Sequence, residues 1–350
     1  MTAMRACLLA FLLLCILIET INAQNDQPSL NIGDPVPPLQ IGEWLKGAPF
    51  KKFEKNKLYV VEFWATWCVP CKAAMPRLSA LAREYKDKVT FLGVDVYENK
   101  NMSIKKVRDF VDSMGNKMDY HVAKEDSNFM EKEWLEASGN PGIPQTFVVN
   151  REGKLAWIEH PKDIDTVLPK IVSNDWDIRE ELAKRNSHRH IKELDDSLNN
   201  ELMKYRGDSR PKDFGKPDSA LFVINEMIKK EPKLKYAPFT VFNTLYLLLK
   251  TKPKNAYAYG KEVMIGANDD EVYDMIVSVI EISSKESTAP PEIYRLGTEA
   301  YQALIDHIPY PEIVDLYKYY YKMAEWYLRA NDKAKTIEAL QKAIEIMKKE

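Results

Sequence analysis

The feature that most constrains this chain is a strand-like run that ends just before two closely spaced cysteines. Residues 58–64 are apolar or aromatic apart from Glu62, a continuous run typical of a buried β-strand. Cys68 and Cys71 follow, and the apolar residues beyond them recur at helical spacing over roughly 70–86. The sequence therefore predicts a buried strand that delivers a Cys-x-x-Cys pair to the start of a helix.

Strands and helices continue to alternate up to about residue 174. The turn-forming residues 151–153 separate two strand-like runs and predict a hairpin, and Ser103 is a suitable N-cap. The expected strands span 89–96, 120–123, 146–150 and 154–159, and the expected helices span 103–114, 128–137 and 163–173. Alternation of this kind, closed by a hairpin, predicts an α/β sheet with an antiparallel edge.

Beyond residue 174 the pattern is helical throughout. Prolines recur where they suit the first turn of a helix: Pro217, Pro232, Pro238, Pro253, Pro290, Pro291, Pro309 and Pro311. The last two expected helices carry small and bulky residues at the spacing of a tetratricopeptide repeat (TPR): Ala324, Tyr327, Thr336, Leu340 and Ala343. We expect an all-helical domain that is TPR-like at its C-terminal end, with a plain helical bundle as the alternative.

The N-terminus has the pattern of a secretory signal peptide. Arg5 supplies a positive charge, residues 7–18 form a short apolar run, and Ala23 offers a small residue at a cleavage site. An uncleaved membrane anchor is the alternative. The expected division is a signal peptide at 1–23, a polar, proline-rich leader at 24–38, an α/β domain at 39–174 and a helical domain at 175–350.

The net charge and the cysteine content limit which classes of function fit this chain. The formal net charge is -2, which gives no reason to expect nucleic acid or an anionic membrane as a partner. Cys7 and Cys15 would leave with the signal peptide, so only Cys68 and Cys71 would remain. A disulfide between such close neighbours constrains the unfolded chain very little, and zinc would need two further ligands that the histidine spacing does not offer. We therefore expect redox chemistry and no metal.

The stretch 61–72, with Trp67-Cys68-Val69-Pro70-Cys71 at its centre, resembles the active site of the thioredoxin superfamily. Together with an opening Gly33-Asp34 and the loop at 143–144, it is similar to the exported TlpA-like thiol–disulfide reductases over roughly residues 30–172. The resemblance implies an α/β thioredoxin fold, a mixed central sheet with flanking helices, for residues 39–174. An all-helical repeat or bundle domain would follow.

The resemblance assigns roles to the cysteines. A helix N-terminus stabilises a thiolate, which would lower the pKa of Cys68 and make it the accessible nucleophile. Cys71, one turn further in, would resolve the mixed disulfide. Trp67, Val69 and Pro70 would face the substrate. Trp64 would either wall the site or pack in the core.

The loop before the expected strand at 146–150 contributes a second element. In proteins of this family a proline here follows a cis peptide bond and faces the disulfide, a role that falls on Pro144. The backbone at Ile143 would pair with an extended substrate segment. A trans proline is the alternative, and the nearby Pro141 is a competing candidate.

The resemblance also places Glu62 where thioredoxins carry a buried acid beneath the cysteines. Desolvation would raise the pKa of Glu62, which could then take the proton of Cys71. The family's usual lysine partner is absent, with Phe91 at its place, and Ala74 stands where some members carry a glutamate. An edge-exposed glutamate without a role is the alternative.

The expected function is a thiol–disulfide oxidoreductase that reduces protein disulfides in the periplasm or outside the cell, with no cofactor other than its own Cys68–Cys71 disulfide. Val69 and Pro70 give neither charge nor donor between the cysteines, which favours a reductase over an oxidase or isomerase. The expected electron donor is a membrane-bound thiol protein. The alternatives are a client-binding protein and, less favoured, a thiol peroxidase, because Ala65 stands where peroxidases carry threonine. The helical domain would bind a protein partner or self-associate.

The signal-peptide interpretation predicts cleavage after Ala23. Intact-mass analysis of the exported protein should show Gln24 as the first residue, in its open or cyclised form. A mature protein that still begins at Met1 would contradict the prediction.

Overall fold

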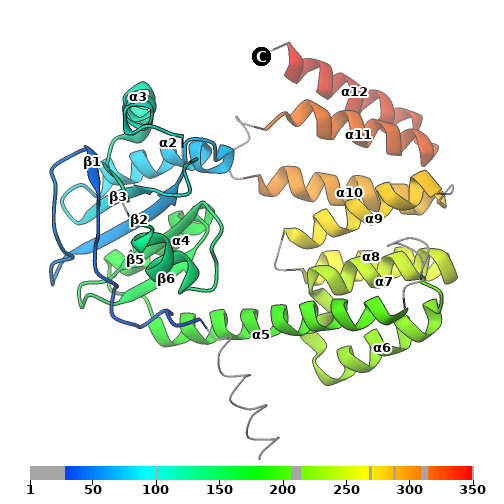
Figure 1. Ribbon diagram of the computed structural model, residues 1–350. Coiled ribbons are helices and arrows are strands. Elements are labelled where there is room, and N and C mark those ends of the chain that lie inside the picture. Colours follow the sequence, from blue (N-terminus) through cyan, green and yellow to red (C-terminus); the bar gives the residue numbers. More distant parts are fainter. Residues whose placement is uncertain are drawn as a thin grey trace, which may run out of the picture. The chain divides into compact units, whose positions relative to one another are not determined.

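The computed structural model describes residues 28–99, 101–125, 127–205, 214–267, 270–286, 289–308 and 314–348. The chain divides into two compact units, residues 1–183 and 184–350, which we call the sheet unit and the helical unit (Figure 1). The expected signal peptide at 1–23 lies outside the described residues. Of the helices described, none has the length and apolarity needed to cross a membrane.

One mixed sheet forms the centre of the sheet unit. Its strands are β1 (Glu43–Lys46), β2 (Leu58–Trp64), β3 (Val89–Asp95), β4 (His121–Lys124), β5 (Gln145–Val149) and β6 (Leu155–Glu159). They lie in the order β1-β4-β3-β2-β5-β6, with β2, β3 and β4 parallel and the other pairings antiparallel. All seven residues of β2 are buried because this strand has neighbours on both sides. The predicted thioredoxin fold is confirmed.

The sheet unit's helices also match their predicted positions. They are α2 (Val69–Glu84), α3 (Ile104–Met114) and α4 (Ile164–Val172), with short 3₁₀ turns at η1 (Gly115–Met118) and η3 (Pro161–Asp163). Ser103 caps α3 as expected, since its hydroxyl accepts the N–H of Lys106. Ser79 of α2 donates to the Lys117 carbonyl in η1 at 2.8 Å, so α2 and α3 cover the same face of the sheet.

Two elements differ from the sequence expectation. The short strand β1 was not expected, and it pairs only with β4. The segment expected as a helix at 128–137 contains a π-helix, η2 (Glu131–Glu136), in which the Ala137 N–H bonds to the Lys132 carbonyl. Trp134 of this segment is fully buried against Phe63 and Phe147, at ring-centroid distances of 5.8 and 5.2 Å. Packing of this ring, rather than local propensity, sets the wider turn.

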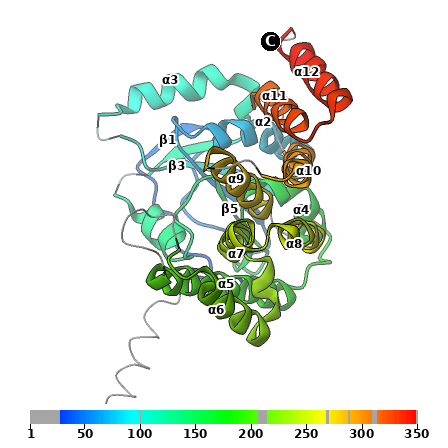
Figure 2. The ribbon, with the colours of Figure 1, turned by 90° about the vertical axis from the view of Figure 1, so that its right-hand side faces the viewer.

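The helical unit contains no strand among its described residues. Its helices are α5 (Ile178–Leu202), which crosses the division between units, α6 (Pro217–Lys230), α7 (Pro238–Thr251), α8 (Pro253–Gly266), α9 (Glu271–Glu286), α10 (Pro291–His307), α11 (Leu316–Arg329) and α12 (Lys333–Met347), with 3₁₀ turns η4 (Met203–Tyr205) and η5 (Pro232–Tyr236). The prolines predicted to start helices do so in α6, α7, α8, α10 and η5. Pro309 and Pro311 lie outside the described residues. From α9 to α12, each helix packs on the one before it (Figures 1 and 2).

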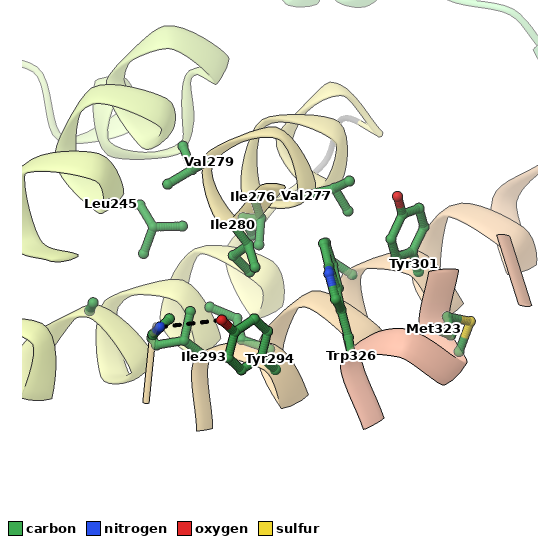
Figure 3. Close-up of a cluster of buried hydrophobic side chains, with 14 of the residues drawn as sticks. Leu245, Ile276, Val277, Val279, Ile280, Ile293, Tyr294, Tyr301, Met323 and Trp326 are labelled. Atoms are coloured by element: carbon green, nitrogen blue, oxygen red, sulfur yellow. Dashed lines mark hydrogen bonds between the residues drawn. The ribbon is translucent and has the colours of Figure 1, made fainter. Parts of the chain in front are cut away.

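The helical unit has its own core, centred on Trp326. This side chain is fully buried, and its ring lies 4.9 Å from that of Tyr301 (Figure 3). Gly297 of α10 allows the close approach, because a Cβ there would lie 2.2 Å from a ring carbon of Trp326 and 3.1 Å from Ile280. A side chain at position 297 is therefore excluded by packing.

The last helix pair meets the repeat expectation only in part. Ala324 and Ala343 are buried, as small contact residues should be. Leu340, which was expected to fill the groove between the helices, is 37% exposed, and the neighbouring Ala339 is buried. Ala339 and Ala343 are four residues apart and lie on the same face of α12, so this buried face includes the expected position 343.

The packing around Gly297 predicts that Gly297→Ala destabilises the helical unit. Overpacking costs about 1–3 kcal/mol, and alanine recovers at most about 1 kcal/mol of helix propensity. We expect a net loss of about 1–2 kcal/mol, measured by urea unfolding followed by far-ultraviolet circular dichroism.

Gly215→Ala is the control, because a Cβ at position 215 would meet no atom within 4 Å. Its free energy of unfolding should stay within about 0.5 kcal/mol of wild type. Equal effects of the two substitutions would show that contact with Trp326 is not the cause.

Candidate active site

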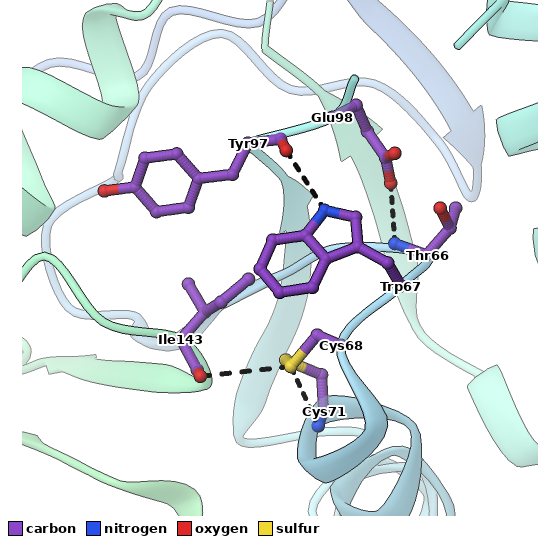
Figure 4. Close-up of a disulfide and its surroundings, with 7 residues drawn as sticks. All are labelled: Thr66, Trp67, Cys68, Cys71, Tyr97, Glu98 and Ile143. Carbon is purple, nitrogen blue, oxygen red and sulfur yellow. Dashed lines mark hydrogen bonds between the residues drawn. A yellow bond between two sulfur atoms is a disulfide. The ribbon is translucent and has the colours of Figure 1, made fainter.

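The two predicted cysteines meet at the first turn of α2. Cys68 is the N-cap residue, and the Cys71 N–H donates to its Sγ at 3.2 Å. Their sulfurs form a disulfide of 2.01 Å (Figure 4). Cys68 is 3% exposed and Cys71 is 0% exposed, so Cys68 is less accessible in this oxidised form than the sequence suggested.

Three predicted substrate-facing residues surround this pair on the surface. Trp67 and Val69 are 56% and 54% exposed, which is unusual for side chains of their size and polarity. Pro70 is exposed beside them, in the first turn of α2. The exposed side chains form a small apolar rim next to a buried disulfide. Trp64, by contrast, is fully buried and stacks on Phe110 of α3, so it belongs to the core.

The loop before β5 lies on the other side of the disulfide. The Ile143–Pro144 peptide bond is cis, as the resemblance implied, and Pro144 is buried. The Ile143 carbonyl oxygen lies 3.9 Å from Cys68 Sγ (Figure 4). Pro141, the competing candidate, is exposed and not preceded by a cis bond. The structure thus brings Ile143 and Pro144 to the cysteines.

Glu62 lies inside the sheet, not at an edge. It is 2% exposed, and neither carboxylate oxygen has a hydrogen-bond partner among the described residues. Burial raises the pKa of Glu62 to about 8. Gly93, not Phe91, lies opposite it on β3. Alternation along β2 puts Glu62 on the same face as Trp64, the face that α2 and α3 cover.

Two further polar residues near this site were not predicted from the sequence. The buried Tyr120 hydroxyl lies near Glu62, and burial, with a smaller contribution from the Glu62 charge, raises the pKa of Tyr120 well above its ordinary value. Glu98 accepts a hydrogen bond from the backbone of Thr66, two residues before Cys68. Both contacts join segments that are distant in sequence, so no local sequence pattern predicts them.

In the part of the chain that the structure describes, no group of three or more histidine, cysteine or acidic side chains could hold an ion. The groups found at the site are the two sulfurs, a buried carboxyl group and the backbone around them.

Comparisons with known proteins bear on this geometry. The thioredoxin family profile matches residues 45–111. Protein FixW of Rhizobium leguminosarum is 33% identical over 153 residues, which are 42% of this chain and 69% of FixW. The thiol:disulfide interchange protein HelX of Rhodobacter capsulatus is 28% identical over 153 residues, 43% of this chain and 80% of HelX. The crystal structure of StoA from Bacillus subtilis covers 36% of this chain and 90% of its own, at 22% identity and a TM-score of 0.31.

The matched region is less than half of this chain, and it includes both cysteines of the active-site pair. Because the match to FixW covers more than two thirds of that protein and the thioredoxin profile spans the pair, the chain belongs to the thioredoxin family of thiol–disulfide oxidoreductases.

Proposed function

We propose that this protein reduces protein disulfides through the Cys68–Cys71 pair. The observation that carries the proposal is the position of the pair, between the N-terminus of α2 and the Ile143–Pro144 loop. Unpaired N–H groups at a helix N-terminus stabilise a thiolate on the N-cap residue. Cys68 is therefore the nucleophile, and Cys71, fully buried one turn further in, acts second.

The reaction proceeds by two exchanges. The Cys68 thiolate attacks one sulfur of the substrate disulfide, forms a mixed disulfide and releases the other sulfur as a thiolate. Cys71 then loses its proton and attacks Cys68 Sγ. This step forms the Cys68–Cys71 disulfide and releases the second substrate thiol. Two electrons pass to the substrate, and a dithiol donor must restore them.

The substrate is an extended segment carrying a cystine. The Ile143 backbone, beside Cys68 Sγ, offers it strand-like pairing. The exposed Trp67, Val69 and Pro70 offer it an apolar contact. Backbone pairing does not depend on sequence, so this site suits disulfides of many proteins.

Glu62 serves as the proton acceptor for Cys71. It faces the side of the sheet that α2 covers, and α2 carries Cys71 in its first turn. A pKa of about 8 for Glu62 is close to that of an ordinary thiol, so proton transfer between them, directly or through water, is nearly balanced in energy. No cofactor is needed for either exchange.

The proposed direction of electron transfer rests on the residues between the cysteines, and the proposed place of action rests on the N-terminal sequence. Val69 and Pro70 provide no charge or donor that would favour the reduced form, so the pair is suited to give electrons. We place the protein outside the cytoplasm on the strength of the N-terminal sequence pattern. HelX, a relative, bears the name of a thiol:disulfide interchange protein. A membrane-bound thiol protein would supply the electrons in that compartment.

The helical unit, which we regard as TPR-like, would bind a protein partner or a second copy of the chain. Ile337, Leu340, Ile344 and Met347 support this role, because they recur at helical spacing on α12 and are 37–57% exposed.

The cysteine roles predict opposite behaviour of two variants. Cys68→Ser should lower reduction of a protein disulfide on the order of a thousandfold or more, because the nucleophile is lost. Cys71→Ser should still attack and should accumulate a covalent adduct that excess dithiol dissolves. Non-reducing electrophoresis and intact mass measure both. Adducts that form with Cys68→Ser and not with Cys71→Ser would reverse the assigned order.

The burial of Glu62 predicts a pH dependence of stability. The pKa of Glu62 is higher in the folded than in the unfolded protein, so the folded state retains the proton longer. The stabilising contribution of this proton to the free energy of unfolding is fully present below a pH of about 4.5. It is lost as the pH rises to about 8, by up to about 1.4 kcal/mol per pH unit. Glu62→Gln should remove this component.

The measurement is urea unfolding of the oxidised protein between pH 5 and pH 8, with and without the substitution. Glu62→Gln should gain stability relative to wild type as pH rises, since glutamine cannot ionise. Other buried acids titrate in both proteins and cancel in the difference. A constant difference across this range would show that Glu62 is not neutral in the folded protein.

A further inference from the structure

The turn after β3 holds the loop that leads into the cysteine pair. The Tyr97 carbonyl accepts the indole N–H of Trp67 at 3.1 Å. Glu98 Oε1 accepts the backbone N–H of Thr66 at 2.6 Å, a short bond of the kind that a carboxylate forms. Figure 4 shows both contacts, with the Trp67 ring lying between this turn and the cysteine pair. Tyr97 and Glu98 thus bind the two residues that directly precede Cys68.

We infer that Glu98 is a positioning residue for the nucleophile: it fixes the Thr66 amide, and with it the geometry of the 65–67 loop from which Cys68 attacks. The inference rests on the proposed reductase function and concerns the first exchange. Glu98 does not touch substrate or sulfur in this arrangement. It acts through the backbone of the loop.

The backbone of the turn is shaped for this contact. Tyr97 has a φ of 55°, in the left-handed region that residues other than glycine rarely adopt. In this conformation the Tyr97 carbonyl and the following Glu98 side chain both bind the same loop. Uncommon conformations of this kind persist where the surrounding structure requires them, often beside functional sites.

A buried acid, Asp95, lies near Glu98. Asp95 ends β3, is fully buried, and binds Lys124 Nζ through Oδ2 at 2.9 Å. Asp95 Oδ1 and Glu98 Oε2 are both buried, and neither has another partner among the described residues. Burial raises the pKa of Asp95 to about 7 against the effect of Lys124, and the Glu98 carboxyl adds to the rise. The Glu98 carboxyl therefore lies close to Asp95.

The two exchanges should depend on Glu98 to different degrees. The first exchange requires Cys68 to meet a substrate aligned on the Ile143 backbone. Cys68 directly follows the 65–67 loop, whose Thr66 amide is bound by Glu98. The second occurs between Cys68 and Cys71, which are already joined through the first turn of α2. Loss of the Thr66–Glu98 hydrogen bond should therefore slow the attack of Cys68 on the substrate more than the resolution of the mixed disulfide by Cys71.

The test measures the attack step by itself. In full-length protein carrying Cys71→Ser, the reduced chain is mixed with a fluorogenic peptide disulfide, and formation of the mixed disulfide is followed by stopped flow. Glu98→Ala should slow this step about tenfold, as expected when a charge-assisted hydrogen bond is lost. Glu98→Gln keeps an acceptor oxygen for Thr66 and should retain most of the rate. The Trp67 indole N–H, followed by NMR, should exchange faster in Glu98→Ala only.

Thr66→Pro removes the donor and leaves Glu98 in place, so it closes a double-mutant cycle. In the Thr66→Pro background, Glu98→Ala should cause no further slowing. If Glu98→Ala alone fails to fold, as judged by circular dichroism, the test uses the other two single variants: Thr66→Pro should slow attack about tenfold and Glu98→Gln should not. Additive effects would overturn the inference, and so would equal slowing by Glu98→Ala and Glu98→Gln, which would point to charge rather than to the contact. A wild-type chain that reduces no disulfide would instead overturn the proposed function.

Discussion

The pairing of β2 with its two neighbours determines where every part of the redox site lies. β2 is parallel to β3, so both strands end at the same edge of the sheet, where the chain turns into Cys68 on one side and Glu98 on the other. β5 is antiparallel to β2, with Gln145 opposite Phe63, so β5 begins at that same edge. Pro144 immediately precedes it. One strand register therefore brings together loops that are 30 to 75 residues apart in sequence.

Because β2 is central and buried, its one acidic residue, Glu62, is removed from water. A carboxyl group buried on a strand with no hydrogen-bond partner among the described residues is destabilising when charged. The rise in its pKa from 4.5 to about 8 corresponds to on the order of 5 kcal/mol of lost preference for the charged form. An apolar residue at this position would pack without this penalty. In the proposed mechanism this glutamate takes the proton of Cys71 near neutral pH, a role that an apolar residue could not fill.

The sequence predicted the parts of the fold that burial alone specifies. A seven-residue strand with every side chain buried is recognisable as a continuous apolar run, and Ser103 signals a helix start by its capping chemistry. β1 was missed because half of it is polar or charged and its only strand pairing is with β4. The π-turn around Trp134 was missed because it depends on packing against Phe63. Propensity carries no information about either.

The same distinction applies to the site. Cys68, Cys71 and Pro144 could be placed from a local motif and its resemblance to a family, since each stands in a recognisable short segment. Glu98 could not, because its partner is a backbone N–H, which every residue but proline carries and no sequence pattern marks. All these residues belong to the sheet unit, while the helical unit encloses a core of its own side chains. The two sulfurs and the groups that surround them thus all lie within the sheet unit.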